Sequence, residues 1–142
     1  MNGLTLRSPA MVARAAPSGV KEVTEVNCTD STGGAFATAG EGKAFVISSA
    51  SQRYGLWGFV ALETEPDLSG DDVTTYVQVT VGALDDDTVI ADLFKTALEG
   101  VGFAVVANAA ILTVTDAATG TRVGAIDRTS GTFIVTVITQ GS

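Results

Sequence analysis

The side chains that usually carry enzyme chemistry are scarce in this sequence of 142 residues. It has no histidine, so the commonest proton shuttle is missing and neither a Ser-His nor a Cys-His nucleophile pair can form. The single cysteine, Cys28, allows neither an internal disulfide nor a cysteine cluster for zinc, and is expected to be a small buried apolar side chain. No glycine-rich phosphate loop stands between a strand and a helix. The sequence therefore predicts a protein that is not an enzyme, with no catalytic residue, no metal ligand and no cofactor.

Two runs of acidic residues are the remaining candidates for a metal site: Asp71 with Asp72, and Asp85 with Asp86 and Asp87. Calcium takes several oxygen ligands, which alternate along known binding loops. These acids are contiguous, and three consecutive side chains rarely converge on one ion. A helix cap with solvated charge is the preferred interpretation, and calcium binding near the second run stays an open alternative. Paired carboxylates could also hydrolyse glycosides, but no feature singles out a pair.

Aromatic residues on one short segment could form a ligand-binding platform. Trp57 and Phe59 fall on the same face of an expected strand, with Tyr54 nearby. Two core residues would show the same spacing, and aromatic side chains bury a large area. The core is the preferred interpretation for Trp57 and Phe59.

A helix is predicted over residues 87–99. Aspartates in front of it can accept hydrogen bonds from its first free amides, and their charge suits the positive helix end. Gly100 and Gly102 can supply a left-handed stop. Apolar residues recur at helical spacing and give one stripe: Val89, Ile90, Leu93, Phe94, Ala97 and Leu98.

Short strands are predicted on both sides of this helix. The clearest is 73–81, where valine alternates with polar residues as in a half-buried strand. Residues 30–42 and 63–72 have loop composition, and 116–120 that of a turn. The predicted strands are 23–28, 44–48, 54–62, 73–81, 103–107, 111–115, 122–126 and 132–138. The order strands, helix, strands predicts an α+β domain with a mostly antiparallel, sandwich-like sheet over residues 23–142.

The last predicted strand has one apolar face and one mixed face, so both faces are expected to need a cover. Phe133, Val135 and Val137 alternate with a second face that includes Ile134 and Ile138. Isoleucine side chains are costly to leave in water, and closed rotational symmetry is the usual way to cover them. Ile134 and Ile138 are therefore candidates for an oligomer interface.

Residues 1–22 are interpreted as an extended arm, because Pro9 and Pro17 break helices and no period is sustained. Residues 1–21 carry a charge of +3, whereas the remaining residues hold all 16 acids and five bases, a charge of −11. So acidic a domain repels nucleic acid, and no apolar run is long enough for a membrane helix. The residues expected to contact a partner are Leu4, Leu6, Arg7, Met11, Val12 and Arg14.

Five segments, taken in order, resemble a module of roughly 100 residues, the size of a small domain, that is found in virion proteins of tailed phages. The residues at 42–50 (GKAFVISSA) are similar to its "yFxInSA" opening and those at 54–59 (YGLWGF) to its "kYYVWF" strand. The predicted helix stands where the module has "AasVAtalaaAi". Residues 111–120 (ILTVTDAATG) are similar to "VtVTnaatG", and 129–141 to "TGFtisVttQG".

The resemblance covers about residues 23–141, with departures. Gly55 and Gly58 replace larger residues, the loop 63–72 lacks the glycine run "dgggtdPa", and residues 1–22 have no counterpart. The module is often repeated in longer proteins, whereas it stands alone here. It brings no catalytic residues to carry over.

The resemblance implies a virion component, and two roles compete. A capsid decoration (cement) protein would bind the major capsid protein on the outside of the head and form a homo-oligomer, most simply a trimer, with the arm gripping a neighbour. Such a protein would be made in the host cytoplasm and end on the capsid surface. The alternative is a fibre or spike module that binds a host receptor or glycan. A small hydrolase is disfavoured by the missing chemistry.

Overall fold

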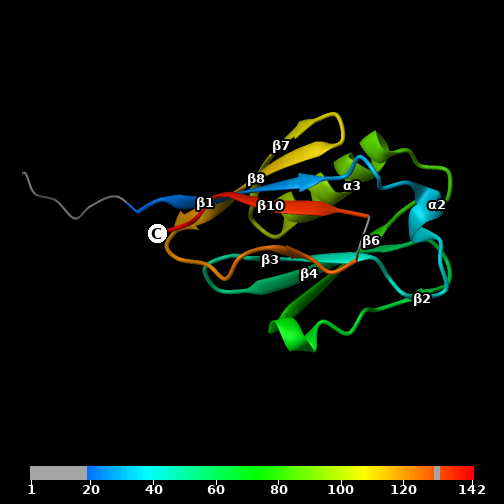
Figure 1. The fold of residues 1–142 in the computed structure, drawn as a ribbon, viewed down its shortest axis with the longest axis horizontal. Helices are drawn as coiled ribbons and strands as arrows, with labels where there is room; N and C mark the ends of the chain where they lie inside the picture. Colours follow the sequence, from blue (N-terminus) through cyan, green and yellow to red (C-terminus); the bar gives the residue numbers. More distant parts are fainter. Residues whose placement is uncertain (1–18, 130–131) are drawn as a thin grey trace, which may run out of the picture.

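A computed structural model describes residues 19–129 and 132–142. These described residues form ten strands and one long helix, with two short helical turns (Figure 1). The elements are β1 (Lys21–Asn27), α2 (Gly33–Phe36), β2 (Gly40–Glu41), β3 (Ala44–Ser48), β4 (Arg53–Phe59), β5 (Glu63–Thr64), η1 (Ser69–Asp71), β6 (Thr75–Thr80), α3 (Asp87–Gly100), β7 (Ala104–Asn108), β8 (Ile111–Thr119), β9 (Ile126–Asp127) and β10 (Ile134–Thr139).

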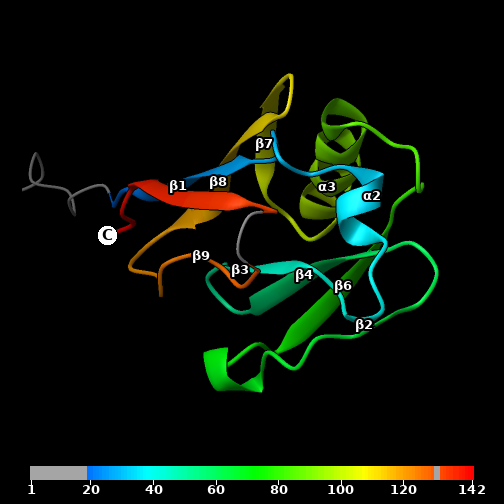
Figure 2. The same ribbon diagram turned by 45° about the vertical axis from the view of Figure 1, so that its right-hand side comes forward.

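Two four-stranded sheets form the layers of a sandwich (Figure 2). In the first sheet the order is β10-β1-β8-β7 and every pair is antiparallel. In the second sheet the order is β6-β4-β3-β9, in which β6 runs parallel to β4 and the other pairs are antiparallel. Strands β2 and β5 form a small parallel ladder beside it. The predicted α+β class with mostly antiparallel strands is confirmed.

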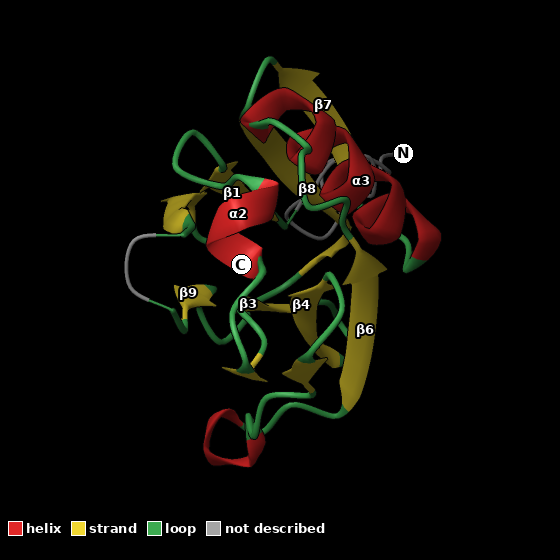
Figure 3. Ribbon diagram, turned by 90° about the vertical axis from the view of Figure 1, so that its right-hand side faces the viewer, coloured by secondary structure: helices red, strands yellow, loops and turns green. Residues whose placement is uncertain are grey.

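Helix α3 closes the side of the sandwich between β7 and β6 (Figure 3). Its first turn is capped by Asp86, whose Oδ1 accepts a hydrogen bond from the Val89 amide at 3.0 Å. The helix ends at Gly100, two residues before Gly102, which has the left-handed φ of 105° that favours glycine. The predicted helix and its aspartate cap are therefore confirmed. No helix among the described residues has both the length and the apolar character needed to cross a membrane.

Four phenylalanines meet at the centre of the main core, between the two sheets and α3. The ring centroid of Phe94 lies 5.9 Å from that of Phe36, 5.8 Å from that of Phe45 and 5.1 Å from that of Phe133. All four side chains are buried. Aromatic pairs at these separations add to the stabilisation that burial alone provides.

Phe36 belongs to a helix that the sequence did not predict. Residues 30–42 were expected to be a loop, but α2 forms within them, with the Thr32 Oγ1 accepting a hydrogen bond from the Ala35 amide at 3.2 Å. Four residues are too few to show helical periodicity. Burial of Phe36 against the rings of Phe94 and Phe133 explains why this turn holds.

A second, smaller core covers the other face of the β6-β4-β3-β9 sheet. Trp57, Ala44 and Val46 pack there against Leu68, and Phe59 packs at its edge. Leu68 comes from the segment between β5 and η1, which crosses over this face. This sheet is therefore buried on both faces. The core interpretation is confirmed for Trp57, whereas Phe59 is half-buried and packs against this core from its edge.

Several predicted boundaries were wrong. β1 begins at Lys21, inside the segment interpreted as an arm, and β8 runs on to Thr119 through the predicted turn 116–120. In the predicted strand 122–126, only the last residue, Ile126, is in a strand. The segment before it is instead held by the Arg53 side chain, which donates to the carbonyls of Val123 and Gly124.

Close packing explains the glycines at positions 55 and 58 of β4. A Cβ on Gly58 would lie 2.2 Å from the Phe36 ring, and one on Gly55 would lie 2.5 Å from the Leu68 side chain. The ring and the leucine occupy the space that larger side chains would fill.

Replacing Gly58 with valine is expected to lower the free energy of unfolding by about 1–3 kcal/mol, because an overpacked core must shift the Phe36 ring. Urea unfolding measures the loss. In a Phe36→Ala background the same substitution should cost less, since the obstructing ring is gone. Gly70→Ala, where a Cβ would meet nothing within 4 Å, is the control. An equal loss in both backgrounds would contradict the collision.

Candidate interaction surface

Ile134 and Ile138 lie on β10, the strand at one edge of the first sheet. Their side chains are 53% and 58% exposed, while Val135 and Val137 between them pack against the main core. The strand therefore turns one apolar face inward and leaves the other in solvent, as the alternation in the sequence indicates. The arm residues Leu4, Leu6, Arg7, Met11, Val12 and Arg14 lie outside the described residues.

The exposed isoleucines belong to a larger surface, the outer face of the β10-β1-β8-β7 sheet. Cross-strand pairing defines it, because the inward rows hold core residues such as Val26, Leu112 and Val114. The alternate rows point away from the core. The outer face comprises the row Ile134, Asn27, Ile111 and Asn108, the row Thr136, Glu25, Thr113 and Val106, the row Val23, Thr115 and Ala104, and Ile138 at the bulge beside the third row.

No described segment covers this outer face. Val106, in the middle row on the edge strand β7, is 69% exposed. Thr113 and Thr136, on either side of Glu25, are exposed as well. Glu25 is the only ionisable residue in the three rows. A nearly uncharged patch of apolar side chains mixed with Asn and Thr, on a strongly acidic domain, suits a surface that binds another protein.

Most of this surface could not be predicted from the sequence. Val106 and Ile111 were assigned to a hairpin, but nothing in the sequence indicated which of their two faces lay outside. The alternation within each strand was the available signal. It could not be oriented without knowing that β8 lies between β1 and β7.

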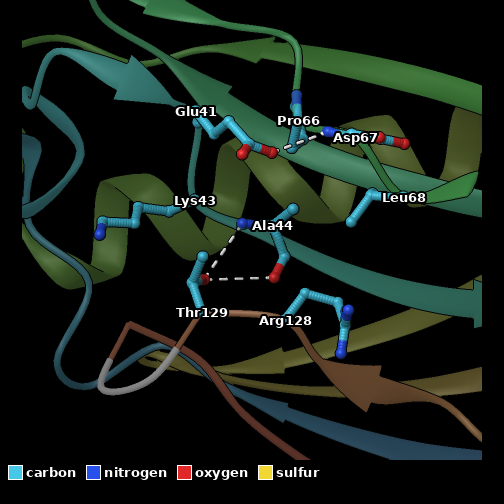
Figure 4. Close-up of a pocket in the computed structure, with 9 residues that line it drawn as sticks. Glu41, Lys43, Ala44, Pro66, Asp67, Leu68, Arg128 and Thr129 are labelled. Atoms are coloured by element: carbon cyan, nitrogen blue, oxygen red, sulfur yellow. Dashed lines mark hydrogen bonds between the residues drawn. The ribbon is translucent and has the colours of Figure 1, made fainter. Parts of the chain in front are cut away.

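A hollow of about 420 Å³ lies beside the second sheet, between β2, the start of β3 and the segment after β5 (Figure 4). Its polar groups mostly bind one another: the Glu41 carboxylate accepts a hydrogen bond from the Asp67 amide at 2.8 Å, and the Thr129 hydroxyl contacts the backbone of Ala44. The Lys43 side chain extends away from Thr129 and Ala44 (Figure 4). These contacts fasten the crossing segment to β2 and the segment after β9 to β3, so the hollow has a structural explanation.

The acidic runs serve local structure. Asp86 caps α3, and the Asp85 carboxylate accepts a hydrogen bond from the Gly82 amide at 2.7 Å. Within residues 19–129 and 132–142, no group of three or more histidine, cysteine, aspartate or glutamate side chains is placed to hold a metal ion. Cys28 is fully buried, and burial raises the pKa of its thiol to about 12. A thiol with so high a pKa is unreactive at neutral pH.

A buried polar cluster closes the end of the sandwich where β1 begins. The Asp116 carboxylate lies 2.5 Å from the Arg122 Nε, with both side chains nearly inaccessible to water. Beside them the Glu22 carboxylate accepts a hydrogen bond from the Gln140 amide at 2.8 Å. Burial raises the pKa of Glu22, and the nearby negative charge of Asp116 raises it further. The cluster joins β1, β8 and the chain end after β10.

Because the pKa of Glu22 is higher in the folded protein, the folded state binds this proton more tightly than the unfolded chain. The stability it contributes is complete below the unfolded pKa and is lost as the pH rises through the folded pKa. Glu22→Gln is therefore expected to be more stable than the wild type near pH 7 and equal to it near about pH 3.5, below the ordinary glutamate pKa. Urea unfolding across this range measures the difference. Glu25→Gln, which removes one charge from the outer face, is the control, and a variant less stable than the wild type near neutral pH would contradict the prediction.

The fold and this surface together define an α+β sandwich with one sheet buried on both faces and the other open on its outer face. The chain matches no family model, no curated protein and no solved structure.

Proposed function

We propose that this chain is a structural protein of a tailed double-stranded DNA phage, that it decorates and stabilises the outside of the capsid, and that it has no enzymatic activity. The observation that carries the proposal is the open outer face of the first sheet. It offers apolar, Asn and Thr side chains with one carboxylate, Glu25, and residues 22–142 around it carry a net charge of −11. Such a face supports binding to protein rather than to nucleic acid.

The order of the five segments that resemble the virion module supports the phage assignment. Their placement in the fold is consistent with one module: 42–50 contains β3, 54–59 lies in β4, 111–120 contains β8, and the tail contains β10. An acidic domain is repelled by packaged DNA, which favours the outer side of the shell.

The partners in this proposal are the major capsid protein and further copies of the chain. Ile134 and Ile138 would lie in the contact between copies, and a trimer suits the threefold and quasi-threefold positions of a capsid lattice. The charge of the domain opposes close approach, so the contact should be apolar at its centre with the acids at its rim. Residues 1–18 would reach a neighbour in the shell.

Phage particles that carry the chain, and the same particles with its gene deleted, provide the test. An antibody against the chain should label heads, and deleted particles should release DNA at a lower temperature. Purified wild-type protein should restore the release temperature, whereas Ile134→Lys should not. Leu84→Lys, at a fully exposed position away from the outer face, is the matched control and should restore it. Labelling of tail fibres, or an unchanged release temperature, would overturn the proposal.

A further inference from the structure

We propose that residues 1–18 of one copy bind the outer face of the β10-β1-β8-β7 sheet of a second copy. The inference deepens the proposed function, on which it rests for the presence of many copies side by side, by naming the surface that the N-terminal segment recognises. The contact it describes needs only two copies of the chain, so it can be tested without capsids.

The size of the outer face suits an extended segment better than a second folded domain. Neighbouring strands lie about 4.8 Å apart, so four strands give a face about 19 Å wide. Stable contacts between two folded domains bury about 800 Å² on each partner, more than such a face offers alone. Eighteen residues reach at most about 60 Å when extended, which is enough to cross the whole face.

The charge of the outer face favours residues 1–18 as its occupant over the same face of a second copy. Glu25 lies in the middle row, flanked by the uncharged Thr136 and Thr113. A second copy that docked through the same face would bring another Glu25 into the contact, where like charges disfavour association. Residues 1–18 hold Arg7 and Arg14 and no acid, so they are complementary to Glu25 and to the acidic domain around it.

Both the N-terminal segment and the outer face carry apolar side chains that could pack together. Leu4 and Leu6 flank Thr5, and Met11 and Val12 form an adjacent apolar pair further along the segment. The outer face presents exposed isoleucines at 134 and 138 and valine at 106. Burying these side chains together removes apolar area from water on both partners.

The start of the domain favours a contact between copies over a contact within one chain. Val20 and Ser142 exchange two backbone hydrogen bonds, of 2.9 and 3.0 Å. These bonds extend the β1–β10 pairing to the residue before β1 begins. Gly19 lies so close to this ladder that a Cβ on it would be 2.5 Å from the Ser142 carbonyl oxygen. The chain therefore enters β1 in line with the strand, and a segment that covered its own sheet would have to reverse direction before residue 19.

Disulfide trapping between full-length chains tests the contact. One chain carries Met11→Cys and a mass tag, and the other carries Thr113→Cys, at an exposed position in the middle of the outer face. The native Cys28 is buried and unreactive, so it adds no background. In a mixture under mild oxidation, we expect the mixed disulfide dimer to exceed at least tenfold the dimer formed with Thr96→Cys, which lies on the exposed side of α3.

Two further variants test the chemistry of the contact. Adding Glu25→Lys or Ile134→Lys to the Thr113→Cys chain should each reduce the mixed dimer at least fivefold, while circular dichroism shows that the variants fold. A mixed dimer no more abundant than the Thr96→Cys control, or one that both variants leave unchanged, would overturn the inference. So would a Met11→Cys/Thr113→Cys double variant that closes its disulfide only within one chain. None of these outcomes depends on capsid binding, which the particle experiment tests separately.

Discussion

Replacing Phe94 with aspartate is expected to abolish the folded state. Phe94 is fully buried on α3, and its ring contacts those of Phe36, Phe45 and Phe133. Truncation of a buried phenylalanine alone costs about 3–5 kcal/mol, and an unpaired carboxylate at the same site adds the cost of burying a charge. Since small domains are stable by about 5–15 kcal/mol in all, the sum is large enough to unfold the chain.

Circular dichroism and urea unfolding measure this loss. Val89→Asp, on the same helix but at an exposed position near its N-terminus, is the control. A negative charge there suits the helix dipole, so the change should stay within about 0.5 kcal/mol. A folded Phe94→Asp variant with a sharp unfolding transition would show that the main core does not depend on the four rings.

Replacing Asp116 with alanine is expected to lower the free energy of unfolding by about 3–5 kcal/mol, because it leaves a buried guanidinium without its partner. Arg122 lies against Asp116 at 2.5 Å and also donates to the carbonyls of Ala118 and Thr119. The carboxylate in turn accepts a hydrogen bond from the Ala118 amide. Loss of the Asp116 carboxylate should loosen the segment after β8, together with the end of the sandwich where β1 begins.

The exposed ion pair of α3 provides the comparison. Lys95 and Glu99 lie 3.2 Å apart on the helix surface, and Glu99→Ala should cost no more than about 0.5 kcal/mol. The double variant Asp116→Ala/Arg122→Met should be more stable than Asp116→Ala alone, because the unpaired charge is removed as well. If Asp116→Ala and Glu99→Ala lost equal stability, the burial of the first pair would have no energetic consequence.

The local elements of this fold could be predicted from the sequence. The apolar stripe, the aspartate before it and the glycine after it specify α3, because each signal acts within a few residues. The alternation in 73–81 and the hairpin of β7 and β8 are equally local. The same alternation correctly separated Ile134 and Ile138 from the core side of β10.

What joins distant parts of the chain was decided only by the tertiary structure. The Ser31 hydroxyl donates to the Thr132 carbonyl 101 positions away, and Gln140 binds Glu22 across 118 positions. The parallel pairing of β6 with β4, the second core under Leu68 and the phenylalanine on α2 also depend on such contacts. Periodicity reports which residues share a face of one element, but not which element that face meets. The outer face of the first sheet is therefore a property of the strand order, since eleven residues on four strands become one three-row surface only when β10, β1, β8 and β7 lie side by side.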